Sequence, residues 1–181
     1  DGLLVGGGMA YTFLKANGIN IGRSLIERDK ISVAKELMTD AANYGVKVLL
    51  PTDHLTGDEN KENSSISDVN IPEGRIGLDI GPRTTDRFIE EIGRSNTVLW
   101  NGPVGLFEVE PFDQGSKALA RALAAHRSDI VSIVAGGDTV AAVTAAGVAD
   151  HITHLSTGGG ATLEFLGGRE LPGIKALEKT A

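Results

Sequence analysis

Residues 130–146 read IVSIVAGGDTVAAVTAA, and this stretch decides the fold class. An apolar, β-branched run stops at Gly136-Gly137, Asp138-Thr139 follows, and an alanine-rich segment comes next. The pattern predicts a buried strand over 129–135, a tight turn without side chains, and a helix over 139–146 that is opened by an N-cap residue. Helix N-termini present unpaired N–H groups that attract anions. Because a carboxylate in the same turn repels a phosphate unless a metal ion lies between them, the stretch predicts a metal–phosphate site.

The composition is that of a globular protein with a real core, since 41% of the 181 residues are hydrophobic. The formal net charge of -7 argues against a general nucleic-acid binder, but it leaves room for a local anion site built from backbone dipoles. The sequence contains no cysteine, no visible signal peptide and no apolar run long enough to span a membrane. We therefore expect a cytoplasmic protein with no membrane or nucleic-acid partner. The first residue is Asp1 and an apolar run follows at once, so we expect a fragment or a processed chain.

Apolar runs alternate with amphipathic segments about six times along the chain. The runs predict strands over 3–5, 46–50, 75–80, 97–100, 129–135 and 151–155. The amphipathic segments predict helices over 9–17, 32–44, 84–94, 112–126, 139–146 and 161–166. The polar stretch 56–72 predicts an exposed loop or a short edge hairpin. We predict an α/β fold with one doubly wound domain over 1–181, a Rossmann-like three-layer sandwich in which helices cover both faces of a mainly parallel sheet.

Four predicted strand ends are unusual, and in a doubly wound sheet they would share the edge where ligands bind. These turns are Gly6-Gly7-Gly8, Asn101-Gly102-Pro103, Gly136-Gly137-Asp138-Thr139 and Ser156-Thr157-Gly158-Gly159-Gly160. The last turn has no carboxylate and suits a bare phosphoryl group. The third carries Asp138, which suits a phosphate bound through Mg²⁺. Asn101 can donate its amide to another phosphate oxygen, and Glu108 can accept from ribose hydroxyls.

Each of these residues also has a simpler interpretation. Asp138 can serve only as a helix N-cap. A single glycine-rich turn is more often tight packing, and Glu108 alone is a solvated acid. Asp53-His54 resembles half of a catalytic dyad, but no activated serine is evident and a turn is favoured.

Known nucleotide motifs are missing. The P-loop pattern G-x-x-x-x-G-K-[ST] does not occur. No G-x-G-x-x-G is followed by an acidic ribose partner at the usual distance, which disfavours a dinucleotide-binding domain; Glu27 is the nearest acidic candidate. No Lys or Arg lies in any of the four turns. Phosphoryl transfer needs cations on the moving group, so we expect them to come from a part of the protein that this chain lacks.

Taken together and in order, the motifs resemble the signatures of the phosphoglycerate kinase family. They are Val5-Gly6-Gly7-Gly8-Met9-Ala10-Tyr11-Thr12-Phe13-Leu14-Lys15, Trp100-Asn101-Gly102-Pro103-Val104-Gly105-Leu106-Phe107-Glu108, Gly136-Gly137-Asp138-Thr139 and Ser156-Thr157-Gly158-Gly159-Gly160-Ala161. Leu50-Pro51-Thr52-Asp53, Gly77-Leu78-Asp79-Ile80-Gly81-Pro82 and Leu171-Pro172-Gly173-Ile174 fit as well. The resemblance is to the C-terminal, nucleotide-binding domain of a two-domain kinase. The family's N-terminal domain, which binds 3-phosphoglycerate, and a strand–turn just upstream that carries a phosphate-contacting lysine have no counterpart here.

The resemblance implies reversible phosphoryl transfer from 1,3-bisphosphoglycerate to ADP, which gives ATP and 3-phosphoglycerate in glycolysis. This chain would supply the Mg-nucleotide site and would be inactive alone, and the full-length protein would be a monomer. The adenine pocket would be lined by Gly7, Gly8, Gly77, Leu78 and Leu106. A dinucleotide-dependent oxidoreductase domain and a non-catalytic nucleotide-binding module stay open as alternatives.

The resemblance also implies contacts along the rest of the nucleotide. Glu108 would hold the ribose, Asn101 would contact phosphates, and Asp138 would be the Mg²⁺ ligand. The terminal phosphates would lie against Gly136, Gly137 and Thr139. The transferring group would be steadied by catalytic backbone contacts at Gly137, Gly158, Gly159 and Gly160. Ser116 stands where the family often has threonine, at a position expected to touch none of these contacts.

Overall fold

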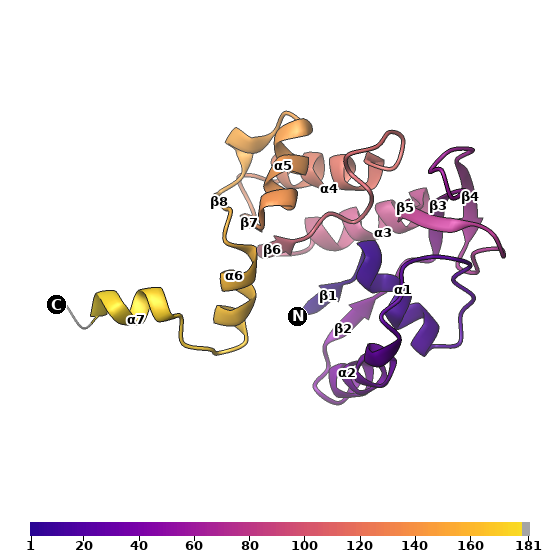
Figure 1. Cartoon of the computed structure of the whole chain (residues 1–181). Coiled ribbons are helices and arrows are strands. Elements are labelled where there is room, and N and C mark those ends of the chain that lie inside the picture. The colour runs from indigo at the N-terminus through magenta and orange to yellow at the C-terminus, as the bar shows by residue number, and fades with distance from the viewer. Residues whose placement is uncertain (179–181) are drawn as a thin grey trace.

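The structure is a computed structural model that describes residues 1–178. Helices and strands are mixed along these residues (Figure 1). The strands are β1 (Gly2–Leu4), β2 (Lys47–Leu49), β3 (Asp53–Gly57), β4 (Ser65–Asp68), β5 (Ile76–Ile80), β6 (Thr97–Asn101), β7 (Val131–Ala135) and β8 (His154–Ser156). The helices are α1 (Gly7–Ala16), α2 (Ile31–Asn43), α3 (Pro82–Gly93), α4 (Gln114–Ala125), α5 (Gly137–Ala145), α6 (Gly159–Leu166) and α7 (Pro172–Glu178). Short 3₁₀ helices occur at η1 (Arg28–Lys30) and η2 (Ala149–His151).

Parallel strands flanked by helices confirm the predicted α/β class. β6, β7 and β8 form one parallel sheet, and β1 pairs in parallel with β2. The sequence predicted one continuous sheet, whereas these strands are divided between two. A third sheet, in the order β4-β3-β5, is antiparallel.

An apolar groove separates β1 from β6. Within residues 1–178, neither strand forms a ladder with the other. Side chains from α3 and α4 form part of the lining, and Leu3 and Leu99 on the two facing strands are 50% and 37% exposed. The full lining is Gly2, Leu3, Leu4, Phe88, Glu91, Ile92, Ser95, Thr97, Val98, Leu99, Trp100, Val104, Leu119 and Leu123. The division of the parallel sheet therefore leaves two open strand edges on either side of this groove.

The polar region after β2 is more ordered than its sequence indicates. Of the two forms predicted for 56–72, the edge hairpin is the observed one, because β4 pairs antiparallel with β3 at the edge of its sheet. The favoured turn at Asp53-His54 is wrong, since both residues are buried in β3. Asp53 accepts hydrogen bonds from the N-terminus of α3, and Thr56 donates to Ser65. Polar residues can be buried in this strand because most of their hydrogen-bonding groups have partners elsewhere in the protein.

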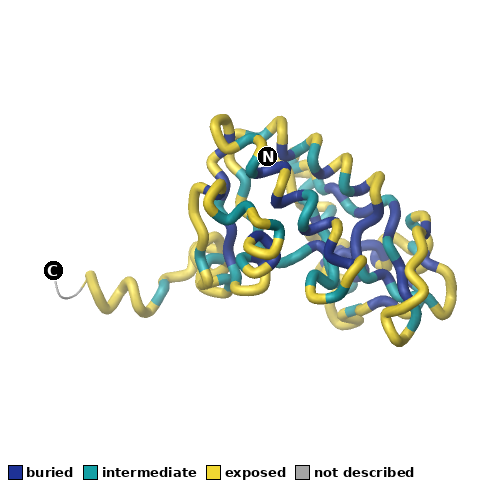
Figure 2. Tube along the Cα trace, turned by 90° about the horizontal axis from the view of Figure 1, so that it is seen from above, coloured by how far each residue is buried: buried dark blue, intermediate teal, exposed yellow. Residues whose placement is uncertain are grey.

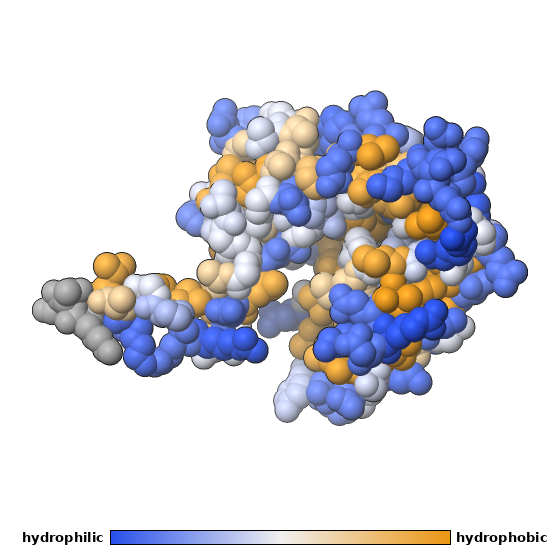
Figure 3. All heavy atoms as spheres, in the orientation of Figure 1, coloured by the Kyte–Doolittle hydropathy of each residue, from blue (hydrophilic) through white to orange (hydrophobic). Residues whose placement is uncertain are grey.

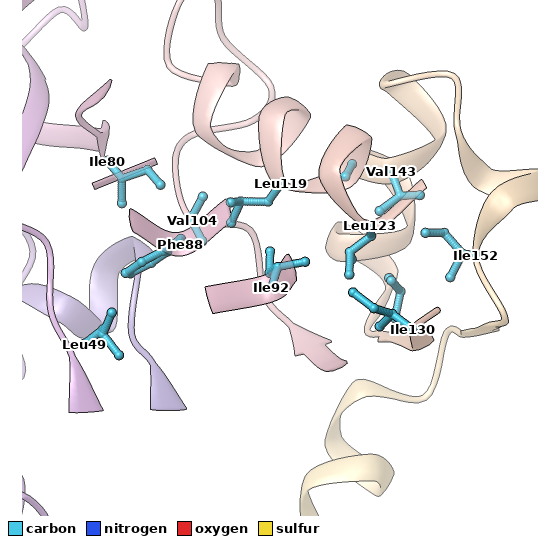
Figure 4. Packing of buried hydrophobic residues seen from close by; sticks show 12 residues of the cluster. Leu49, Ile80, Phe88, Ile92, Val104, Leu119, Leu123, Ile130, Val143 and Ile152 are labelled. Carbon is cyan, nitrogen blue, oxygen red and sulfur yellow. The ribbon is translucent and has the colours of Figure 1, made fainter. Parts of the chain in front are cut away.

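The main hydrophobic core lies between the helices and the parallel sheet of β6, β7 and β8. Figure 4 shows side chains from α3, α4 and α5 gathered there, among them Phe88, Leu123 and Val143. Each of these three is at most 1% exposed. A second cluster, which includes Phe13 and Ala34, joins α1 to α2. Figure 2 shows these buried positions running through the body of the molecule. The cores therefore hold α1 and α5, which follow the first and third glycine turns, whereas α6 has no buried residue.

The C-terminal segment projects from the body, as Figures 1 and 2 both show. The sequence predicted only a tail from Leu171, whereas α7 occupies Pro172–Glu178. Its Ile174 and Leu177 are exposed, and Figure 3 shows hydrophobic atoms on this projecting part. Among the described residues, no helix has both the length and the apolar character needed to cross a membrane.

Candidate functional site

The first two glycine turns are in direct contact. The N–H of Gly7 donates to the carbonyl oxygen of Val104 at 3.0 Å. A Cβ atom on Gly7 would lie 2.7 Å from the carbonyl oxygen of Pro103, and Gly7 has a φ of +60°. A Cβ on Gly6 would lie equally close, 2.7 Å from Cγ1 of Val104. Gly7 is therefore needed because the backbone carbonyl of Pro103 passes against it, and Gly6 because the side chain of Val104 does.

The second, third and fourth turns meet around Asn101. The Asn101 amide donates from Nδ2 to the carbonyl oxygen of Gly159 at 3.1 Å. Gly136 donates its N–H to the carbonyl oxygen of Ser156 at 2.8 Å. A Cβ on Gly159 would lie only 2.8 Å from the Cα atom of Gly136. The four turns thus form one continuous surface at the carboxyl ends of the parallel strands, as the sequence predicted.

Three helices begin on this surface without the help of a side chain. The N-cap residues of α1, α5 and α6 are Gly6, Gly136 and Gly158, and in residues 1–178 none of these helix ends has a side-chain cap hydrogen bond. The helices begin at Gly7, Gly137 and Gly159, about two residues earlier than their sequence pattern predicts. The first N–H groups of a helix lack intrahelical partners. This donor set fits phosphate, since such N–H groups are a common anion site.

Asp138 is the only acidic residue in the first turns of these three helices. It is exposed and follows Gly137 in α5, and the N-cap position belongs to Gly136, whose φ is +95°. The interpretation of Asp138 as the N-cap is therefore wrong. Among the described residues, no three acidic or histidine side chains are grouped as a metal site. A single carboxylate beside phosphate donors suits Mg²⁺, which takes one or two protein carboxylates together with phosphate oxygens and water.

The side chain of Thr139 holds the turns together. Thr139 is 1% exposed, and its hydroxyl oxygen accepts a hydrogen bond from the N–H of Gly102 at 2.7 Å. This bond joins the second turn to the third. The sequence predicted a contact of Thr139 with phosphate. Because the Thr139 hydroxyl is bonded to Gly102, that contact would be made by the backbone N–H of Thr139, in the first turn of α5.

The residues predicted to line the adenine pocket lie in three places: at the start of α1, in β5, and in the loop that follows β6. The N–H of Leu106 donates to the carbonyl oxygen of Leu78 at 2.7 Å. Gly7 and Gly8 open α1, and Tyr11 of that helix packs so closely on β5 that a Cβ on Gly77 would lie 2.4 Å from its hydroxyl oxygen. Leu78 and Leu106 are half-buried, whereas Gly77 is buried against Tyr11. The contact with Tyr11 gives Gly77 a packing role.

The loop between β6 and α4 carries Glu108, whose side chain is exposed. Two buried residues that the sequence analysis did not select anchor this loop. Asp79 accepts from the N–H of Gly115 at 2.7 Å, and Ser116 accepts from the N–H of Val104 at 3.1 Å. Burial raises the pKa of Asp79 to about 7, against the effect of its two N–H donors. The signal for Asp79 was a carboxylate inside an apolar strand. The bond of Ser116 is to Val104, which is not one of the predicted contact residues, so Ser116 bears on those residues only through the loop.

Comparisons with known proteins give a consistent result. The sequence model of the phosphoglycerate kinase family matches residues 1–169. The phosphoglycerate kinase of Koribacter versatilis is 52% identical over 181 residues, which cover 98% of this chain and 45% of that protein. The phosphoglycerate kinase of Clostridium novyi is 52% identical over 180 residues, with coverages of 98% and 45%.

Solved structures agree with the sequence comparisons. The phosphoglycerate kinase of Coxiella burnetii has a TM-score of 0.92 and 41% identity, and the match covers 100% of this chain and 47% of that one. The phosphoglycerate kinase of Pyrococcus horikoshii has a TM-score of 0.80 and 30% identity, with coverages of 97% and 44%. The chain spans about half the length of the relatives it matches. Since the family model covers nearly the whole chain and the fold agrees throughout, the chain belongs to the phosphoglycerate kinase family.

Proposed function

We propose that residues 1–181 form the C-terminal, nucleotide-binding domain of a phosphoglycerate kinase and bind ADP or ATP with Mg²⁺. One observation carries the proposal: the first glycine turn contacts the second, and the second contacts the third and fourth, so three uncapped helix N-termini lie on one surface. Such a surface is rich in N–H donors and poor in side chains, which suits the phosphate chain of a nucleotide.

The phosphates would be bound mainly by backbone. Asn101 uses one amide hydrogen on Gly159, and its second amide hydrogen is left for a phosphate oxygen. The N–H groups of Gly137, Asp138 and Thr139 at the start of α5 would hold the terminal phosphates, with Gly136 shaping the turn because its own N–H is bonded to Ser156. The turn Gly158–Gly160 would steady the transferring group through the N–H of Gly160, since the N–H groups of Gly158 and Gly159 are bonded to Ser156 and Thr157. Asp138 would hold the metal ion. When bound, Mg²⁺ supplies positive charge that offsets the charge on the phosphates.

The base and ribose would bind nearer to α1 and β5. Leu78 and Leu106 are half-buried and joined by a backbone hydrogen bond, so they form an apolar surface of fixed shape. Gly7 and Gly8 lie at the start of α1. Gly77 has no side chain, which allows Tyr11 of α1 to pack directly on β5. The carboxylate of Glu108 is exposed and forms no ion pair within residues 1–178, and it suits the ribose hydroxyls.

The reaction of the whole protein needs more than these residues. We propose reversible transfer of a phosphoryl group from 1,3-bisphosphoglycerate to ADP, in a cytoplasmic monomer whose N-terminal domain binds 3-phosphoglycerate. The four turns contain no Lys or Arg, although a moving phosphoryl group requires cations. A further strand from outside this chain would carry the lysine that supplies positive charge. The groove between β1 and β6 supports this proposal, because both strands have an open edge there. The protein would catalyse this transfer by positioning the two substrates and by neutralising the charge of the phosphates.

The alternative of a dinucleotide-dependent oxidoreductase has less support. Its ribose acid should follow a strand, but Glu27 lies at the N-cap of η1. The acid after β2 is Asp53, which is buried and occupied by the N-terminus of α3. Retention of the fold as a non-catalytic binding module is the other alternative, and a kinase assay of the full-length protein with and without Asp138→Asn separates it from the proposal.

Calorimetric titration of the chain with Mg-ADP tests the binding proposal. We expect saturable binding that Asp138→Asn weakens about tenfold or more, since a charge-assisted contact to the metal is lost. Asp150→Asn is the matched control, because Asp150 is an exposed aspartate in the first turn of η2, at the other end of β8. It should leave the affinity unchanged. A folded chain that gives no heat with Mg-ADP, or one that enhances NADH fluorescence instead, overturns the proposal.

A further inference from the structure

Asp79 is a buried carboxylate that joins β5 to the loop before α4. It is 1% exposed. Its Oδ1 accepts from the N–H of Ile80 at 2.8 Å, and its Oδ2 accepts from the N–H of Gly115, in the first turn of α4, at 2.7 Å. It thus satisfies a helix N-terminus from a neighbouring strand rather than from the helix's own cap.

The loop also packs on the Asp79 side chain directly. A Cβ atom on Gly105 would lie 2.2 Å from Oδ1 of Asp79, and a Cβ on Gly115 would lie 2.4 Å from the same atom. Glycines are required at both positions because the carboxylate occupies the space where their side chains would be. Asp79 therefore fixes the loop at its beginning and at its end.

Two further hydrogen bonds complete this attachment. The residue before Asp79, Leu78, accepts the N–H of Leu106 at 2.7 Å. Ser116 of α4 accepts the N–H of Val104 at 3.1 Å. The segment from Val104 to Gly115 is thus held on β5 and on the first turn of α4. This segment carries Leu106 and Glu108, the two residues proposed to meet adenine and ribose.

We propose that Asp79 is a positioning residue for nucleotide binding, which holds the loop 104–115 so that Leu106 and Glu108 face the base and the ribose. The inference rests on the proposed nucleotide function. It predicts a selective effect, because Asp79 bonds β5 and the first turn of α4 and makes no hydrogen bond to the turns at Gly136 and Gly159 that would bind phosphates. Loss of Asp79 should therefore weaken binding of the nucleoside part and spare the phosphate part.

The test compares Asp79→Asn with Asp53→Asn in the full chain at pH 8. Asparagine keeps the shape but turns one acceptor oxygen into an NH₂ group that faces a backbone N–H. Asp53 is the matched control, since it is also 1% exposed and accepts the N–H groups of Arg83 and Thr84 at the start of α3. Calorimetry gives the affinities for Mg-ADP and Mg-pyrophosphate, and thermal unfolding gives the stability of each variant.

We expect Asp79→Asn to weaken Mg-ADP about tenfold and to change Mg-pyrophosphate less than about twofold, because only hydrogen bonds around the base loop are lost. Asp53→Asn should lower the unfolding temperature with both affinities unchanged. If Asp79→Asn lowers stability yet binds Mg-ADP like the wild type, or weakens both ligands equally, the positioning role is refuted. If the wild type binds neither ligand, the proposed nucleotide function itself has failed.

A second variant keeps the test decisive if Asp79→Asn does not fold. Ser116→Ala removes the acceptor for the N–H of Val104 at the other attachment of the same loop. We expect it to weaken Mg-ADP about threefold, with Mg-pyrophosphate unchanged. Ser132→Ala is its control, because Ser132 is equally buried but bonds Thr153 in the parallel sheet. Equal affinities in these two variants refute the proposal.

Discussion

The contact between Gly136 and Gly159 gives the sharpest test of the proposed site. In Gly159→Ala the new Cβ would lie 2.8 Å from the Cα atom of Gly136 and 3.4 Å from its nitrogen. Ordinary contacts to a Cβ begin near 3.4 Å, so the two turns must separate by more than half an ångström. The obstacle is backbone and cannot rotate away. The separation strains the bond from Gly136 to Ser156 and the bond from Asn101 to Gly159.

We expect Gly159→Ala to lower the free energy of unfolding by about 1–3 kcal/mol, the usual cost of overpacking. The N–H groups of α5 and α6 also move apart, so the affinity for Mg-ADP should fall about tenfold or more, which corresponds to about 1.4 kcal/mol. Urea unfolding and calorimetry measure the two quantities. Gly173→Ala is the control, because Gly173 lies in α7, outside the four turns, and a Cβ there meets no described atom within 4 Å. Equal stability and affinity in the two variants would refute the convergence of the turns as the basis of binding.

Two further predictions concern buried polar groups. Both ring nitrogens of His54 lack hydrogen-bond partners among the described residues, and burial lowers its pKa from 6.5 to about 4. Protonation therefore favours the unfolded chain, and the contribution of His54, roughly 3 kcal/mol, is present above pH 6.5 and lost as the pH falls toward 4. Asp79 acts in the opposite sense, since its raised pKa of about 7 makes stability fall as the pH rises from 3.8 to 7. In urea unfolding at pH 4, 5.5 and 7, His54→Leu should leave only the second trend, and a profile parallel to the wild type would contradict this. Thr139→Val should cost about 1–3 kcal/mol by leaving the N–H of Gly102 unpaired, whereas Thr144→Val, at an exposed position of the same helix, should cost less than about 0.5 kcal/mol in the same assay.

The sequence predicted the elements whose signals are local. Runs such as 129–135 and helical segments such as 112–126 were found because apolar periodicity repeats within a few residues. It missed β3 because that strand is buried with polar residues, among them Asp53 and Thr56, whose partners lie on α3 and β4. A pattern of side-chain polarity cannot identify such a strand without knowledge of those partners.

The helices after the glycine turns show the same limit. Glycine has a low helix propensity, so the pattern placed the start of α5 at Thr139 and made Asp138 a candidate cap. The structure begins α5 at Gly137, because Gly136 adopts a φ of +95° while its N–H is bonded to Ser156. Because Gly136 occupies the N-cap position, Asp138 lies within the first turn of α5, where its carboxylate is exposed.

By itself, the sequence determined the α/β class, the order of the four glycine turns and the presence of one carboxylate in the third of them, since composition and short-range periodicity encode these features. Only the tertiary structure decided which turns touch, how the parallel strands divide around a groove, and that Asp79 and Ser116 anchor the loop of Leu106 and Glu108. The reason is distance along the chain. The bond from Asn101 to Gly159 spans 58 residues, and the bond from Asp79 to Gly115 spans 36. Such contacts arise only when the packed core brings remote segments together.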